Sequence, residues 1–138
     1  MKAKFRAIAF IILSLSACKK DPPQPRQAQY TIIPQNNSGI TGTVSFIEKA
    51  DISQTEVEIE VNNPTSHTCV AHIHQGPPSN YRGAVYIYDP MYASGSHLSY
   101  QQNIPLVYDS ALTYNGTFVF HDSTGNNVLG LCGIGANK

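Results

Sequence analysis

The chain has 138 residues, which is enough for one ordinary domain but not for two. Its formal charge is zero, but three of its nine basic residues (Lys2, Lys4 and Arg6) lie at the start, whereas all nine acidic residues come after residue 20. The chain beyond this start therefore carries a charge of −3, which argues against a nucleic-acid partner, and we expect none.

Residues 1–17 have the pattern of a signal peptide. The basic start is followed by an apolar run, Ala7 to Leu15, which is too short to span a bilayer as a stable helix. The run ends in Leu15-Ser16-Ala17-Cys18, which resembles the lipobox of bacterial lipoproteins, in which the cysteine is acylated. We therefore expect Cys18 to carry lipid that anchors the protein to a membrane of the cell envelope. The alternative is an ordinary signal peptide with a coincidental cysteine.

Residues 18–27 are polar and rich in proline, with the sequence CKKDPPQPRQ. They contain no apolar pattern that folding could bury, so we interpret them as a tether. The remaining residues, 28–138, are expected to form a single β domain.

Short apolar runs bounded by turn residues predict strands throughout this domain. The run Thr55 to Val61 alternates most clearly, with Val57, Ile59 and Val61 on one face and three glutamates on the other, so this strand has one solvated face. About eight such strands without intervening helices favour an antiparallel Greek-key sandwich or flattened barrel. The predicted strands are 30–33, 42–47, 55–61, 70–74, 84–88, 104–108, 117–121 and 129–134.

Three histidines have the spacing of a metal site. His72 and His74 lie two residues apart on a predicted strand, so both project from one face, roughly 7 Å apart. His121 ends another predicted strand, from which it could complete a three-nitrogen site. Imidazole suits copper and zinc, and three or four nitrogens in a near-planar set favour Cu(II). The alternative for His72 and His74 is a solvated polar face.

Several segments resemble the copper/zinc superoxide dismutases in order and spacing. SGITGTVSF (38–46), TEVEIEV (55–61) and AHIHQG (71–76) are similar to the first four strands of that family. NGTFVFHD (115–122) is similar to its strand that ends in a copper-ligand histidine, and residues 124–135 to its closing strand. The stretch AHIHQGPPSNYRGAVYIYD also resembles the chordin-type (CHRD) domain, a relative of the same sandwich.

The dismutase resemblance implies one copper ion bound by His72, His74 and His121. His97 is the candidate for a fourth ligand, at the place of the histidine that bridges copper and zinc in the family; its alternative is a polar loop histidine. We expect no zinc, because the loop that supplies the zinc ligands in the family is short here. No catalytic residue is expected beyond the metal ligands.

Two further cysteines remain after Cys18, and in an oxidising exported compartment Cys69 and Cys132 are expected to form a disulfide. Cys132 matches the disulfide cysteine of the dismutase family. Cys69, in contrast, precedes His72 and does not lie in the following loop, where the family has the partner cysteine.

The sequence departs from the dismutases where the substrate, superoxide, would be captured. The charged loop is reduced to residues 122–124, and the arginine that holds superoxide in the family would fall at Val128 or Leu129. From Ile40 onward there are eight acidic residues and three basic ones, a balance that repels an anion. Two hypotheses follow. The first is a copper-binding, dismutase-like redox lipoprotein with weak or lost dismutation. The second is a non-catalytic CHRD-type surface module for structure, adhesion or metal carriage.

Overall fold

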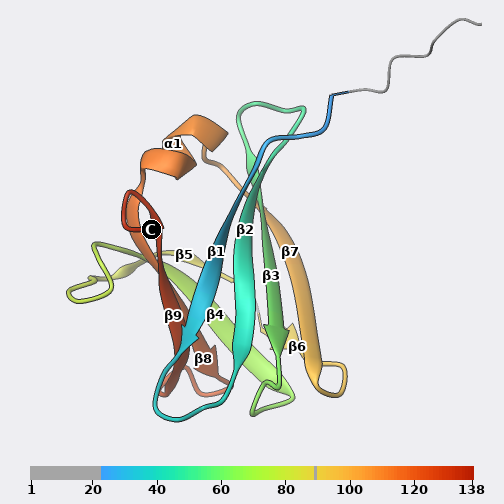
Figure 1. The fold of residues 1–138 in the computed structure, drawn as a ribbon, viewed down its shortest axis with the longest axis vertical. Coiled ribbons are helices and arrows are strands. Elements are labelled where there is room, and N and C mark those ends of the chain that lie inside the picture. The colour runs from blue at the N-terminus through green and yellow to red at the C-terminus, as the bar shows by residue number, and fades with distance from the viewer. Residues whose placement is uncertain (1–22, 89) are drawn as a thin grey trace, which may run out of the picture.

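The computed structural model describes residues 23–88 and 90–138 (Figure 1). The predicted signal peptide, Cys18 and the first part of the tether lie outside the described residues. The described chain is an antiparallel β structure whose strands follow the order β5-β4-β8-β9-β1-β2-β3-β7, with β6 paired to β4, in a sheet that nearly closes into a barrel. This confirms the predicted flattened barrel. The strands are β1 (Gln27–Pro34), β2 (Thr41–Glu48), β3 (Thr55–Asn62), β4 (Thr68–Gln75), β5 (Ala84–Ile87), β6 (Met91–Tyr92), β7 (His97–Ile104), β8 (Asn115–Asp122) and β9 (Val128–Gly135).

Two layers face each other across the core. Strands β1, β2, β3 and β7 form one layer, and β4, β8 and β9 form the other, crossing behind it in Figure 1. Strand β1 joins the layers, since Tyr30 pairs with Val44 of β2 while Ile33 pairs with Leu131 of β9. The short strand β5 forms one edge of the sheet, and β7 forms the other.

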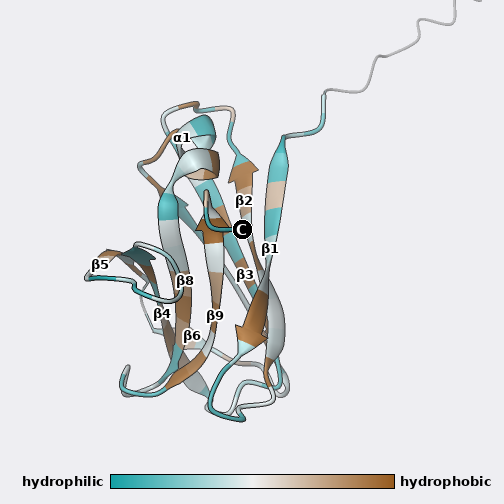
Figure 2. Ribbon diagram, turned by 60° about the vertical axis from the view of Figure 1, so that its left-hand side comes forward, coloured by the Kyte–Doolittle hydropathy of each residue, from teal (hydrophilic) through white to brown (hydrophobic). Residues whose placement is uncertain are grey.

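Alternating side chains build the core between the layers. Val57, Ile59 and Val61 of β3 are fully buried while the glutamates between them are partly exposed, so the predicted alternation is confirmed. In Figure 2, the apolar segments lie mainly on the strands. Burying each large aliphatic or aromatic side chain contributes about 1.5–3 kcal/mol, which makes this core the main source of stability.

Strand β4 orients the predicted metal ligands. Its inward side chains, Cys69, Ala71 and Ile73, are buried in the core. Because successive strand residues point to opposite faces, His72 and His74 lie on the outer face of their layer. Both are half-buried there.

The strand predicted at 104–108 is wrong. Strand β7 ends at Ile104, Pro105 follows, and a short helix, α1 (Tyr108–Thr113), begins soon after. Proline has no N–H to donate to a neighbouring strand, so the sheet cannot continue through it. Strand β7, which precedes this proline, was not predicted because its outer face is polar. For example, the Gln101 side chain of β7 donates a hydrogen bond to Glu58 of β3 at 2.8 Å.

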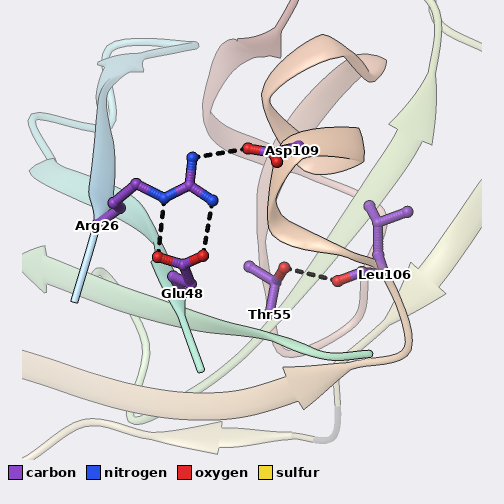
Figure 3. Close-up of polar contacts among 5 residues, drawn as sticks. All are labelled: Arg26, Glu48, Thr55, Leu106 and Asp109. Atoms are coloured by element: carbon purple, nitrogen blue, oxygen red, sulfur yellow. Dashed lines mark hydrogen bonds and ion pairs between the residues drawn. The ribbon is translucent and has the colours of Figure 1, made fainter. Parts of the chain in front are cut away.

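The end of the predicted tether belongs to the folded domain, because β1 already begins at Gln27. Figure 3 shows Arg26 donating twice to Glu48 of β2, at 2.6 and 2.8 Å, and once to Asp109 of α1, at 2.8 Å. This guanidinium lowers the pKa of the Glu48 carboxyl. The three groups tie the entry of the chain to the helix, beside the Thr55 hydroxyl that donates to the Leu106 carbonyl in the same view.

The predicted disulfide is wrong, because Cys69 and Cys132 are both free and buried. Strand β8 lies between β4, which carries Cys69, and β9, which carries Cys132. On β8, Asp122 is opposite Cys69 and Phe118 is opposite Cys132. Four residues along a strand and two strand spacings across put the cysteines on the order of 15 Å apart. A disulfide needs Cα atoms roughly 4.4–6.8 Å apart.

Within the described residues, no helix is long and apolar enough to cross a membrane.

Candidate metal centre

His72 and His74 of β4 and His121 of β8 come together on the outer face of their layer. Each offers one ring nitrogen, and these three atoms all lie within 4.8 Å of one another. The ring centroid of His72 lies 5.6 Å from that of His74 and 5.0 Å from that of His121. The three residues predicted from the sequence therefore form one cluster that could hold a metal ion.

The pairing of β4 with β8 produces this cluster. His72 is opposite Val119, and His121 is opposite Val70, so His72 and His121 are diagonal neighbours on the same face. Diagonal neighbours lie within reach of long side chains. The pairing register also shifts at Phe120/His121 between β8 and β9. Such irregularities re-aim side chains, and here one lies directly at a ligand.

Burial keeps two of the three histidines, His72 and His121, uncharged. His121 is only 7% exposed, and burial, followed by the nearby His72 and His74, lowers its pKa to about 4. The pKa of His72 is also lowered, first by burial and then by His74. His72 and His121 are therefore neutral near pH 7, as metal coordination by imidazole requires.

The cluster contains polar atoms without partners. Nε2 of His74 and both ring nitrogens of His121 are buried, and within the described part of the chain no group meets hydrogen-bond geometry with them; the Asn127 backbone lies near His121 and opposes the lowering of its pKa only weakly. A buried polar atom without a partner costs about 1–3 kcal/mol, so such atoms call for an explanation. A metal ion would satisfy two of them, Nε2 of His74 and one ring nitrogen of His121, since each histidine offers one ligand atom. Because metal–imidazole distances are about 2.0–2.1 Å, two ligand nitrogens can be at most about 4.2 Å apart, and the rings would close slightly on the ion.

The structure does not bring His97 to this cluster. His97 begins β7, where its Nε2 lies 2.8 Å from Oε2 of Glu60 and its Nδ1 lies 3.3 Å from Oδ1 of Asn62. Both of its ring nitrogens are thus engaged by residues of β3. The described residues supply three histidine ligands and no fourth.

One group at the site had no signal in the sequence. The backbone carbonyl oxygen of Arg82 lies 2.6 Å from Nδ1 of His74. The ring centroid of Tyr81 lies 4.9 Å from that of His74. Every residue type carries a carbonyl, so no pattern of residue types marks this contact.

Comparison with models of protein families and with curated proteins finds no match to this chain.

Proposed function

We propose that this protein is an exported lipoprotein whose β domain binds one copper ion through His72, His74 and His121. The observation that carries the proposal is a cluster of three imidazoles in which three buried ring nitrogens have no partner. An all-nitrogen set of ligands suits copper, and the oxygen ligands that calcium or magnesium prefer are missing from the cluster. Copper, when bound, supplies one-electron redox chemistry.

The residues around the cluster define what it can do with a substrate. His72 and His74 are only half-buried, so the site lies near the surface, although Nε2 of His74 and both ring nitrogens of His121 are buried. By resemblance to the copper/zinc dismutases, superoxide is the candidate substrate. We expect weak or absent dismutation, because Asp122 directly follows His121 and stays ionised: hydrogen bonds from Thr124 and Asn127 lower its pKa to about 2. A fixed negative charge beside the site repels an anion.

The acidic surroundings equally favour the second candidate, a CHRD-type module that carries copper at the cell surface without catalysis. Both candidates use the same three histidines. They differ in whether the loaded protein turns over superoxide.

Copper content tests the proposal directly. We expect purified protein loaded with Cu(II) and freed of excess metal to retain one ion per chain by elemental analysis. The double variant His72→Ala/His74→Ala should retain none, whereas the matched variant His67→Ala/His97→Ala, which replaces two histidines outside the cluster, should retain one. Equal circular dichroism spectra would show that both variants fold. Copper retained by the first variant would overturn the proposal.

The same preparations separate the two candidates. A dismutase that repels its substrate should be slow, and its rate should rise when salt screens the repulsion. Carriage without catalysis predicts no rate above that of the metal-free protein. A rate near the diffusional ceiling of about 10⁸–10⁹ M⁻¹s⁻¹ that falls with added salt would contradict the expected weak activity.

A further inference from the structure

We infer that residues 76–83, which connect β4 to β5 and are called here the His74 loop, fix His74 in the one tautomer that presents Nε2 to the metal. Arg82 is the positioning residue and acts through its backbone carbonyl. This inference rests on the proposed function and adds to it how the site is held ready before metal arrives.

The tautomer follows from the chemistry of the contact. A carbonyl oxygen only accepts hydrogen bonds, so at 2.6 Å from it Nδ1 of His74 must carry the proton. Neutral imidazole has one N–H, which leaves the lone pair on Nε2. That nitrogen is buried and without a hydrogen-bond partner, in the cluster with His72 and His121. When a histidine binds a metal, its second ring nitrogen commonly makes such an outer contact. The contact fixes the orientation of the ring and raises the basicity of the nitrogen that binds the metal.

The loop is itself held in place on both sides of this contact. The Arg82 N–H donates to the Gln75 carbonyl at 2.7 Å, and the Asn80 N–H donates to the Pro77 carbonyl at 2.9 Å. At its start, the Gly76 carbonyl accepts a 2.7 Å hydrogen bond from the buried Thr117 hydroxyl of β8. The loop is therefore bonded to both strands that carry the ligands: to β4 through Arg82 itself and to β8 through Gly76.

Gly76 offers a way to disturb the loop without touching a ligand. Its φ is +103°, a conformation that residues with a side chain rarely adopt. A Cβ there would lie 2.8 Å from the Asn80 carbonyl oxygen and 3.3 Å from the Tyr81 Cα, so Gly76→Ala must displace the backbone next to Arg82. Gly95 is the matched control: its φ is also positive, at +63°, but a Cβ there meets nothing within 4 Å.

The first measurement needs no variant. In metal-free protein with ¹⁵N-labelled histidine, long-range ¹H–¹⁵N correlation spectra at pH 7.5 report which ring nitrogen carries the proton. We expect His74 to be protonated on Nδ1. A ring protonated on Nε2, or one that averages between both forms, would overturn the inference.

The second measurement is copper affinity by chelator competition. Loss of an outer contact to a metal ligand commonly lowers affinity about 10–100-fold, and we expect that loss in Gly76→Ala relative to Gly95→Ala. A second pair of variants serves if Gly76→Ala does not fold. Because the Tyr81 ring packs on His74, Tyr81→Ala should bind copper more weakly than the wild type, whereas Tyr81→Phe, which keeps the ring, should bind it as tightly as the wild type. Equal affinities across both pairs would overturn the positioning role alone. Wild-type protein that binds no copper would instead overturn the proposed function.

Discussion

At the scale of single residues, His121 combines deep burial with the absence of a partner. His72 and His74 are half-buried as residues, with Nε2 of His74 buried, whereas in His121 both ring nitrogens are shut away from solvent. This combination makes the metal-free protein sensitive to acid, because a proton that enters the site puts a charge where water cannot reach it.

We predict that the metal-free protein loses stability as the pH falls from about 6.5 to about 4. In this window the unfolded chain binds a proton at His121 that the folded chain, with a pKa of about 4, does not. The free energy of unfolding therefore rises with pH through the window, by up to about 3 kcal/mol. The lowered pKa of His72 adds in the same direction.

Urea unfolding of metal-free protein at pH 7.5, 5.5 and 4.5 measures this loss. Leucine at position 121 cannot titrate, so His121→Leu should show a clearly smaller loss between pH 7.5 and 4.5 than the wild type. A variant that loses as much stability as the wild type would show that His121 titrates near its ordinary pKa.

At the scale of elements, the sequence predicts what depends on alternation. The valine and isoleucine positions of β3 repeat every two residues, and His72 and His74 share a face for the same reason. Strand β7 could not be predicted in this way, because the polar partners of its outer face lie on β3, far away in the sequence. The engagement of His97 by Glu60 escaped prediction for the same reason.

Strand order also decides the fate of the cysteines, which no local pattern could reveal. With β8 between β4 and β9, Cys69 and Cys132 remain thiols. Burial raises the pKa of Cys132 to about 12, and burial, followed by the nearby Asp122, raises that of Cys69. Thiols rather than thiolates predominate at neutral pH, and only thiolates react rapidly with alkylating agents.

We therefore predict that the folded protein resists alkylation at Cys69 and Cys132, and that both are alkylated in denaturant without any reducing agent. Mass spectrometry of the two peptides, with a reduced sample as the control, measures this. A peptide pair that is released only by reduction would mean that exported protein forms the disulfide and rearranges its strands to do so.

At the scale of the whole molecule, the point where the chain enters the domain is fixed away from the metal ligands. Arg26 binds Glu48 at the end of β2 and Asp109 of α1, whereas the three histidines lie on β4 and β8. If the proposed anchor is attached before residue 26, it would pull first on β1, on β2 through Glu48 and on the helix. It would not pull directly on β4 or β8, the strands that carry the site.

We predict that Cys18→Ser releases the protein from membranes while copper binding persists at one ion per chain. Under the proposed lipidation, acyl chains would hold the protein on the membrane because each buried CH₂ contributes about 0.8 kcal/mol, and serine lacks the thiol that would be acylated. The measurement is fractionation of cells into membrane and soluble parts, with copper determined on the variant purified from the soluble part. Because Arg26 and its partners stay in place, the fold that assembles the three histidines does not depend on the anchor. A Cys18→Ser protein that is processed at the same site and still sediments with membranes would show that something other than this cysteine holds it there.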